Sequence, residues 1–319
     1  MSAADDRRVA RPETNRGVPT DRGRRPDWLR VRIRQTPELE AVRRLVADEG
    51  LHTVCASASC PNLSECWSRG TATFMIGGDT CTRRCGFCDV STGRPEELDP
   101  FEPGRVAQAV QRLGLAFAVI TCVARDDLPD GGAGQMAATI RAIRQRAPGT
   151  GVEVLIADYK GDDGALRRVL EAGPDVLNHN LETVDRLQRR IRPAAGYERS
   201  LGVLRRSRRI RPAIPTKSGL MLGLGERDEE VEQALRDLRA VGVDLLTLGQ
   251  YLRPSPDHVP VERYVPPDEF DAWAARARDM GFREVAAGPL VRSSYHAERL
   301  AGRAPEAPRP APAPGTPAR

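Results

Sequence analysis

Short apolar segments alternate with amphipathic segments along most of the chain. Seven apolar segments have the length and the aliphatic, β-branched composition that are typical of buried strands. They are TATFMIGG (71–78), FAVITCV (117–123), GVEVLIAD (151–158), DVLNHNLE (175–182), KSGLMLG (217–223), LLTLGQYL (245–252) and REVAAGPLV (283–291). Runs of this kind, without polar alternation, favour strands of a parallel sheet that is covered on both faces.

Between these segments the apolar positions recur with a helical period. Examples are EPGRVAQAVQRLG (102–114), EEVEQALRDLRAVG (229–242) and PDEFDAWAARARDMG (267–281). A further helix is predicted over 36–50, with Thr36 as its N-cap, Pro37 in its first turn and Gly50 at its end. Strands and helices in this alternation predict an α/β fold, an open or partial (β/α) barrel whose functional residues follow the carboxyl ends of the strands.

Both ends of the chain lack this pattern. Residues 1–27 are rich in Arg, Asp, Pro and Gly, and residues 303–319 are mostly Pro and Ala, so we expect a disordered arm and a disordered tail. Acidic residues and few serines in the arm argue against a mitochondrial presequence. Between them we expect an N-terminal extension over 28–70 and the partial barrel over 71–302.

Composition narrows the class of protein. Of 319 residues, 40% are hydrophobic and 29% charged, and no apolar run has the length of a membrane span. The net charge is +5, but aromatic residues are only 4%, too few for the stacking surfaces of many nucleic-acid-binding proteins. We therefore expect a cytoplasmic protein that binds neither membrane nor nucleic acid.

Six of the seven cysteines lie within residues 55–88, in two sets of three. The sets are Cys55, Cys60 and Cys66, spaced C-x4-C-x5-C, and Cys81, Cys85 and Cys88, spaced C-x3-C-x2-C. The second set follows the first predicted strand, and one loop with this spacing can bind three corners of a 4Fe–4S cube and leave the fourth iron open. A zinc site would need a fourth ligand close by. Cys122, inside a strand, is interpreted as a packing residue.

The sequence CTRRCGFC resembles the signature of the radical S-adenosylmethionine (SAM) superfamily, C-x3-C-x-aromatic-C, with Phe87 at the aromatic position. GLMLGLGE (219–226) is similar to the superfamily's adenine-binding strand and implies contacts from Gly219, Met221 and Gly223. The resemblance implies that the open iron binds SAM, which is cleaved to a 5′-deoxyadenosyl radical.

A narrower resemblance covers about residues 30–300. CPNLSECW, GDTCTRRCGFCDV, RDDLPDGGA, LNHNLET, QYLRPS and GPLVRSSYHAE, in this order, resemble the lipoyl synthase family. That family implies a (β/α)6-type barrel and the insertion of two sulfur atoms, at C6 and C8 of an octanoyl chain on a lysine of a carrier protein. It also implies two 4Fe–4S clusters, of which the auxiliary one supplies sulfur.

The resemblance further implies partners. They are octanoylated lipoyl carrier proteins (2-oxoacid dehydrogenase acyltransferase subunits and the glycine cleavage carrier protein), an electron donor such as ferredoxin or flavodoxin, and an iron–sulfur carrier that restores the auxiliary cluster. Cys55, Cys60 and Cys66 would hold that cluster. By residue match the family places its fourth ligand on Ser294, whereas Ser293 should point the opposite way on an extended chain.

Other polar residues at strand ends are candidate cofactor contacts. They are Asp126, Asp127, Asn178, Asn180 and Arg253. RDDLPDGGA can also be an ordinary turn, and Arg253 can also be a capping or ion-pairing residue. His179, between the two asparagines, should face the opposite way and be structural. His52 and His258 belong to no evident constellation and are interpreted as surface or loop residues.

Two alternatives remain open from the sequence. One is another sulfur-inserting radical SAM enzyme of the biotin synthase type, although that resemblance does not supply the C-x4-C-x5-C set. The other is a zinc-stabilised, arginine-rich protein with a structural or nucleic-acid-binding role. Iron and sulfide analysis would separate the second alternative from either enzyme.

Overall fold

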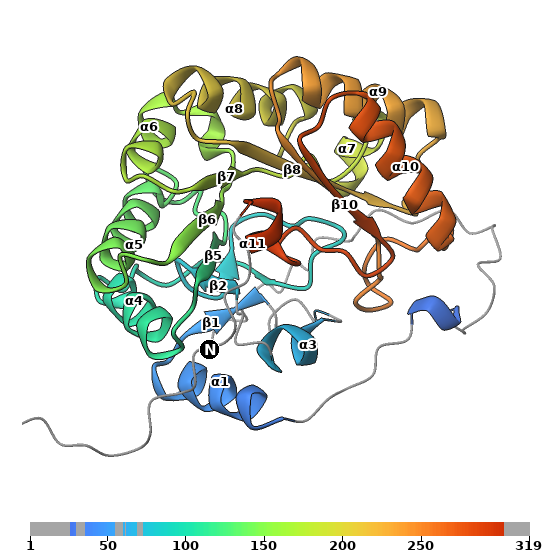
Figure 1. The fold of residues 1–319 in the computed structure, drawn as a ribbon. Coiled ribbons are helices and arrows are strands. Elements are labelled where there is room, and N and C mark those ends of the chain that lie inside the picture. The colour runs from blue at the N-terminus through green and yellow to red at the C-terminus, as the bar shows by residue number, and fades with distance from the viewer. Residues whose placement is uncertain (1–25, 30–35, 55–59, 61, 69–72, 303–319) are drawn as a thin grey trace, which may run out of the picture.

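The computed structural model describes residues 26–29, 36–54, 60, 62–68 and 73–302. One sheet of eight strands runs through it, and only the pairing of β1 with β2 is antiparallel. In spatial order the strands are β1 (His52–Thr53), β2 (Thr73–Ile76), β5 (Phe117–Cys122), β6 (Gly151–Leu155), β7 (Val176–Asn178), β8 (Thr216–Leu222), β9 (Leu245–Gln250) and β10 (Glu284–Gly288). All seven predicted strands and the α/β fold are confirmed. The sheet is curved (Figure 1). It is an open barrel rather than a closed one, because β1 and β10 form two separate edges.

The helices lie mainly along the convex face of the sheet (Figure 1). They are α1 (Pro37–Asp48), α3 (Leu63–Ser68), α4 (Glu102–Arg112), α5 (Ala133–Arg146), α6 (Asp163–Glu171), α7 (Asp185–Ile191), α8 (Tyr197–Ile210), α9 (Asp228–Ala240), α10 (Pro267–Asp279) and α11 (Ala297–Leu300). Short elements complete the chain: the 3-10 turns η1 (Asp27–Leu29) and η2 (Tyr159–Gly161), and the paired strands β3 (Thr80–Cys81) and β4 (Ser91–Thr92). α11 lies on the concave side of the sheet (Figure 1).

The helix that starts at Pro37 shows how the sequence sets an element boundary. The Thr36 hydroxyl accepts a hydrogen bond from the backbone N–H of Leu39 at 3.3 Å, as predicted for an N-cap. Gly50, at φ +57°, stands just past the helix end. None of the helices in the described ranges is long and apolar enough to cross a lipid bilayer.

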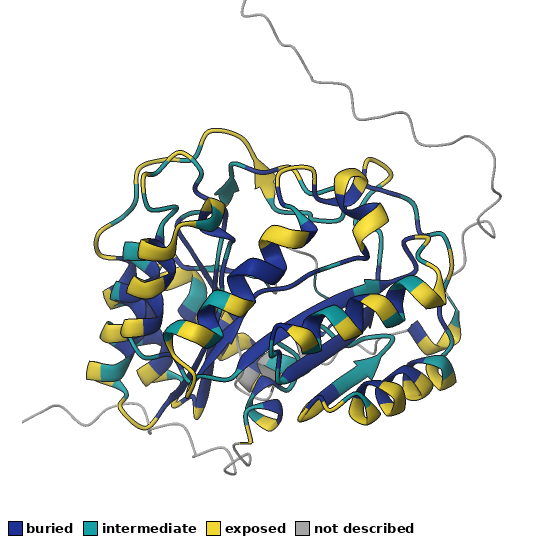
Figure 2. Cartoon of the chain, turned by 90° about the horizontal axis from the view of Figure 1, so that it is seen from above, coloured by how far each residue is buried: buried dark blue, intermediate teal, exposed yellow. Residues whose placement is uncertain are grey.

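The core has an outer part and an inner part, because side chains alternate along each strand. Ala118 and Ile120 of β5 face α4 and α5, whereas Phe117 and Val119 join a small inner cluster with Ala297 of α11. Figure 2 shows the central strands of the sheet buried and each large helix with one buried and one exposed face. The concave side therefore has an apolar floor beneath the carboxyl ends of the strands.

Two histidines, His52 and His258, were interpreted as surface or loop residues, and this holds only in part. His52 is part of strand β1, and His258, although it lies in a loop, is buried and hydrogen bonded at both ring nitrogens. Cys122 packs against the main core, so its interpretation as a packing residue is confirmed. The expected arm and tail fall almost entirely outside the described residues, and the division at 28–70 and 71–302 stays a prediction.

A buried ionic network crosses the inner face of three strands. The Lys217 ammonium (β8) donates to both carboxylate oxygens of Glu153 (β6), each at 2.9 Å, and Asn178 Nδ2 (β7) donates to the same carboxylate at 3.0 Å. All three residues are fully buried. Lys217 is one of only two lysines, Lys160 and Lys217, in the sequence. Its ammonium neutralises the Glu153 carboxylate, because Asn178, the third member of the network, carries no charge.

We expect Lys217→Met to lower the free energy of unfolding by about 3–5 kcal/mol, because it leaves Glu153 as an unpaired buried charge. Urea unfolding followed by circular dichroism measures this. The double variant Lys217→Met/Glu153→Leu should recover most of the loss, although Asn178 then lacks its acceptor. A single variant as stable as the wild type would contradict the expectation.

Candidate active site

Three cysteines lie in one loop, residues 77–90, that follows strand β2 and is called the cysteine loop below. The Cys81 sulfur accepts two backbone hydrogen bonds, from Arg83 N at 3.4 Å and Ala124 N at 3.3 Å. Burial raises the pKa of the Cys85 thiol to about 11 and that of the Cys88 thiol to about 12. Without a cation these two thiols stay protonated at neutral pH, so binding of metal would have to displace their protons.

Backbone contacts hold the cysteine loop to three different parts of the barrel mouth. Thr82 N donates to Ala124 O at 3.0 Å, Gly86 N donates to Ile191 O at 2.8 Å, and Val259 N donates to Gly86 O at 3.0 Å. A Cβ atom on Gly86 would lie 2.9 Å from Val259 Cγ1. Only glycine allows this close approach, and the loop is fixed before any ligand binds.

A buried arginine between Cys81 and Cys85 anchors the same loop. Arg83 donates to both oxygens of Asp126, at 2.7 and 2.8 Å, and to Asp158 at 2.5 Å. Burial lowers the pKa of Arg83, but the two carboxylates outweigh it, and the pKa lies above its usual value. Burial likewise raises the pKa of Asp158, yet hydrogen bonding to Arg83 brings it down to about 2. Arg83 and Asp158 therefore stay charged in the neutral range.

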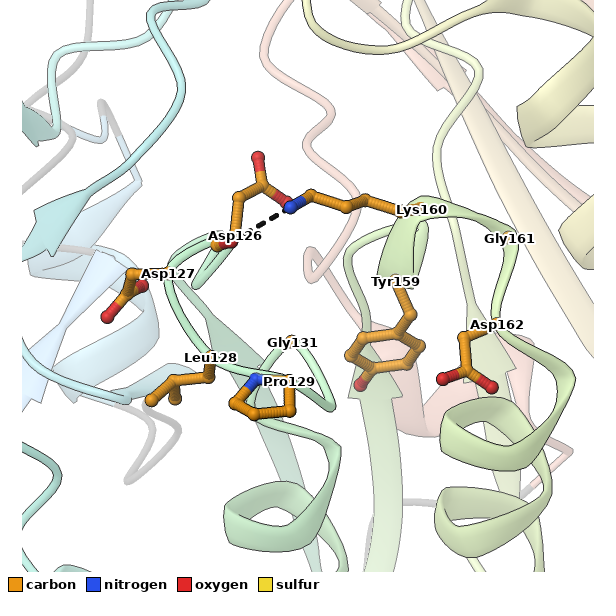
Figure 3. Close-up of a pocket in the computed structure, with 9 residues that line it drawn as sticks. All are labelled: Asp126, Asp127, Leu128, Pro129, Gly131, Tyr159, Lys160, Gly161 and Asp162. Atoms are coloured by element: carbon orange, nitrogen blue, oxygen red, sulfur yellow. Dashed lines mark hydrogen bonds between the residues drawn. The ribbon is translucent and has the colours of Figure 1, made fainter.

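Asp126 and Asp127 lie at the barrel mouth, as predicted. They line a cavity of about 540 Å³ between the β5–α5 and β6–α6 connections, together with Lys160 (Figure 3). The Lys160 ammonium donates to the backbone oxygen of Asp126 at 2.8 Å, and Asp127 forms an ion pair with Arg125. Both carboxylates thus have arginine partners, and their contact with a cofactor stays a prediction.

The polar residues at the end of strand β7 and just after it point to opposite sides of the sheet. His179 bonds to Ile156 O and to Ser200 of α8, so it faces the helix layer and is structural, as predicted. Asn178 and Asn180 face inward, and within the described residues the Oδ1 atom of each is buried without a hydrogen-bond partner. Unpaired acceptors of this kind are unusual in a finished core.

Two buried charges beside the thiols were missed by the sequence analysis. Glu182 accepts a hydrogen bond from Asn180 Nδ2 at 3.1 Å, and Arg192 donates to the carbonyl oxygens of Asn180 and Leu181. Burial raises the pKa of Glu182 against the opposing effects of Arg192 and Asn180. The charges of Glu182 and Arg192 both act on the Cys85 thiol. Glu182 belongs to the quoted LNHNLET motif, but its positive φ of 69° left no trace in the sequence pattern.

Two glycines, Gly219 in strand β8 and Gly223 just after it, are required by close packing. A Cβ atom on Gly219 would lie 2.4 Å from Thr247 Oγ1, and one on Gly223, at φ +95°, would lie 2.3 Å from Gln250 Nε2. The Glu226 carboxylate closes the turn by accepting from Gly223 N at 2.6 Å and Leu224 N at 2.8 Å. Only glycine therefore lets this backbone pack so closely against Thr247 and Gln250.

Three further predicted residues surround this region. Phe87 and Met221 pack, half-buried, against the core of α7–α10. Arg253 folds back on its own turn, where Nε donates to His258 O at 2.9 Å and NH2 donates to Pro256 O. This agrees with the alternative of a structural arginine, and contacts of the three residues with a cofactor stay predictions.

The structure brings members of the other cysteine set together with the C-terminal segment. Cys60, Cys66 and Ser294 line one small cavity, with Asn62 and Tyr295 beside them. Asn62 Nδ2 donates to Leu290 O at 2.7 Å, and the Tyr295 hydroxyl donates to Glu65 at 3.0 Å. Cys55 lies outside the described residues. These contacts tie helix α3 to the segment that follows β10.

Neither cysteine group has the geometry of a mononuclear site. In the part of the chain that the structure describes, no three His, Cys, Asp or Glu side chains converge as ligands of a single ion. The cysteines of a cubane bind different iron atoms, so they do not need to converge on one point. Cys81, Cys85, Cys88 and Cys122 are free thiols.

Comparisons with known proteins show the superfamily and the family of this chain. A model of the Radical SAM superfamily matches residues 75–238. The fold is similar to that of HydG, a maturase of [FeFe]-hydrogenase (TM-score 0.53, 14% identity, 72% of this chain and 61% of that chain). It is also similar to Streptococcus suis SuiB bound to S-adenosylmethionine (TM-score 0.54, 9% identity, 70% of this chain and 53% of that chain). Fold and cysteine loop together define a radical SAM enzyme, a class that uses a 4Fe–4S cluster and SAM.

More similar relatives define the family. Lipoyl synthase of Thermus thermophilus is 56% identical over 293 residues, which cover 91% of this chain and 89% of that protein. Lipoyl synthase of Methylococcus capsulatus is 57% identical over 279 residues, 87% of each chain. That of Mycobacterium tuberculosis is 55% identical over 298 residues, 93% of this chain and 95% of the other. The chain belongs to the lipoyl synthase family.

We expect Gly86→Ala to destabilise the cysteine loop, because the new methyl group would overlap Val259 Cγ1. Overpacking of this kind costs about 1–3 kcal/mol. The midpoint temperature of thermal unfolding and the iron content after anaerobic reconstitution should both fall. Gly104→Ala is a matched control, because Gly104 is an exposed position of helix α4 and its Cβ would meet nothing within 4 Å. Equal iron content in Gly86→Ala and the control would contradict the expectation.

Proposed function

We propose that this protein inserts two sulfur atoms, at C6 and C8, into an octanoyl group that is amide-linked to a lysine of a lipoyl carrier protein. The observation that carries the proposal is the second cavity, in which Cys60, Cys66 and Ser294 meet. A loop such as that of Cys81 to Cys88 is common to the superfamily, whereas a sulfur donor needs a second set of ligands. The similarity to named lipoyl synthases supports the same reaction.

The cysteine loop fits a cluster with one open iron. Cys81, Cys85 and Cys88 would hold it, and a reduced cluster bound there would supply the electron for reductive cleavage of SAM to methionine and a 5′-deoxyadenosyl radical. Arg83 and the backbone contacts of Gly86 hold the loop against the barrel mouth, so the three sulfurs need little rearrangement.

The polar residues at the mouth fit the cofactor's own chemistry. The proposed SAM contacts are Phe87, Asp126, Asp127, Asn178, Asn180, Gly219, Met221, Gly223 and Arg253. To these we add Glu182, whose buried carboxylate can accept hydrogen bonds from ribose hydroxyls or an ammonium group. We also add Arg192, whose guanidinium can pair with a carboxylate. The proposed adenine contacts at Gly219 and Gly223 rest on the resemblance of GLMLGLGE to the superfamily's adenine-binding strand.

The auxiliary set fits a second cluster that is consumed as sulfur substrate. Cys55, Cys60, Cys66 and Ser294 would hold it, with Cys55 judged from the sequence alone. A serine alkoxide is a harder ligand than a thiolate and suits iron less well, so it is the ligand that is lost first. One corner would then open when sulfur is removed.

The partners follow from this chemistry. An octanoyl-lysyl arm on a carrier, either an acyltransferase subunit of a 2-oxoacid dehydrogenase or the glycine cleavage carrier, would enter at the strand ends. An electron donor such as ferredoxin or flavodoxin and an iron–sulfur carrier would reduce and restore the clusters. Free thiols in these numbers require a reducing compartment, which supports a cytoplasmic location.

The test is anaerobic reconstitution followed by assay on an octanoylated carrier peptide. We expect about eight irons and eight sulfides per chain, four of each for each cubane. Lipoyl peptide and 5′-deoxyadenosine should form only when SAM and reductant are present. Zinc without sulfide, or no lipoyl product on any octanoyl-lysyl peptide, would overturn the proposal.

Replacement of Cys85 by alanine should abolish 5′-deoxyadenosine formation, because the radical cluster loses one of only three ligands. The auxiliary cluster should still load, so iron falls by about half. Cys122→Ala is the control, since Cys122 packs against the core and should leave both readouts unchanged. Cleavage of SAM by the Cys85→Ala variant would show that the ligand assignment is wrong.

Ser294→Ala should still form 5′-deoxyadenosine but lose lipoyl product, because only the auxiliary site is changed. Ser294→Cys should hold its cluster and transfer sulfur poorly, since a thiolate is released less readily than an alkoxide. Ser293→Ala is the neighbouring control. Wild-type yield of lipoyl product from Ser294→Ala would remove this serine from the ligand set.

A further inference from the structure

The chain after strand β9 forms a tight turn, residues 253–259, that is stabilised by its own hydrogen bonds. Arg253 donates from Nε to His258 O at 2.9 Å, and His258 N donates to Ser255 O at 3.1 Å. The Tyr251 hydroxyl donates to Val259 O at 2.7 Å. These bonds tie the two ends of the turn together, so it can act as a rigid support for whatever it contacts.

This turn contacts the cysteine loop at two points. Val259 N donates to Gly86 O, and His258 Nε2 lies 3.0 Å from Cys88 O, a contact between residues 170 positions apart in sequence. The sheet edges β1 and β10 are not paired with each other, so such loop contacts join distant parts of the open barrel at its mouth. The cysteine loop after β2 therefore rests on the turn after β9.

The partners of His258 determine the tautomer of its ring. Cys88 O can only accept, so Nε2 must carry the hydrogen in that contact. Nδ1, 2.8 Å from Ser255 Oγ, is then the acceptor of the serine hydroxyl in the neutral ring. The imidazole is only 8% exposed, so little water competes with either bond.

We propose that His258 is a positioning residue for the iron–sulfur cluster that Cys88 binds. Its N–H fixes the Cys88 carbonyl and with it the direction of the thiolate, and places the positive end of a dipole beside the cluster. Fixed donors around a cluster favour its reduced, more negative state. The inference rests on the proposed function, because it takes Cys88 as a ligand.

The geometry also predicts which substitutions preserve this effect. Glutamine can place its amide N–H near the position of Nε2, whereas leucine fills the space without a donor. Ser255→Ala keeps the imidazole but removes the partner of Nδ1, so the ring can adopt the other tautomer. His52→Leu, in strand β1, is the control for loss of a histidine elsewhere.

The experiment uses reconstituted holoenzyme of the wild type, His258→Leu, His258→Gln, Ser255→Ala, His52→Leu and Cys88→Ala. The readouts are iron content and the midpoint potential of the part of the EPR signal that changes on addition of SAM. The rate of 5′-deoxyadenosine formation is a further readout. For His258→Leu we expect a more negative midpoint potential. We also expect 5′-deoxyadenosine to form more slowly by roughly tenfold, which corresponds to the loss of one hydrogen bond to a buried acceptor. His258→Gln should return toward the wild type, and Ser255→Ala should shift the same way by less.

The outcomes separate the inference from the function on which it rests. Equal iron content and EPR signals in Cys88→Ala and the wild type would reject Cys88 as a ligand, and the proposed function with it. A normal wild type together with a wild-type potential in His258→Leu would overturn only the role of His258. If His258→Leu does not fold, a wild-type potential in Ser255→Ala overturns that role in the same way.

Discussion

The buried guanidinium of Arg83 is the interaction on which the arrangement of the mouth depends. It lies between two of the three thiols and binds carboxylates at the ends of two neighbouring strands, Asp126 after β5 and Asp158 after β6. A loop without regular structure over most of its length would otherwise lose much entropy when it is fixed. Because charge-assisted bonds are strong when buried, the cysteine loop has one position relative to the sheet.

Parallel pairing then collects the remaining chemistry at one edge. In the main sheet every strand except β1 runs in the same direction, so residues far apart in sequence end beside one another. The thiols follow β2, Asn180 and Glu182 follow β7, the glycine turn follows β8, and the turn of His258 follows β9. The floor of the concave side, beneath these groups, is apolar, and Val119 and Ala297 are buried there.

Much of this was predictable from local sequence, and the reasons differ by residue. The strands were found because runs such as that of 117–123 have few alternatives, and the cysteine loop because three thiols in eight residues are rarely a packing device. The contact of His258 could not be predicted, because its partner is the backbone carbonyl of Cys88, a group that every residue has. Glu182 depends on a left-handed backbone that no pattern marks. Ser294 came only from family resemblance, because two serines in sequence look alike until one faces a cavity.

The contact between α3 and the segment after β10 has a consequence for the order of synthesis. Glu65 and Tyr295 are 230 residues apart, and at 5–20 residues per second the ribosome needs roughly 10–50 s to travel between them. For that time Cys60 and Cys66 have left the ribosome without the residues that later enclose them. The cavity that Cys60, Cys66 and Ser294 line is therefore completed only late in synthesis, and its thiols spend the interval open to any carrier, or oxidant, in the surrounding solution.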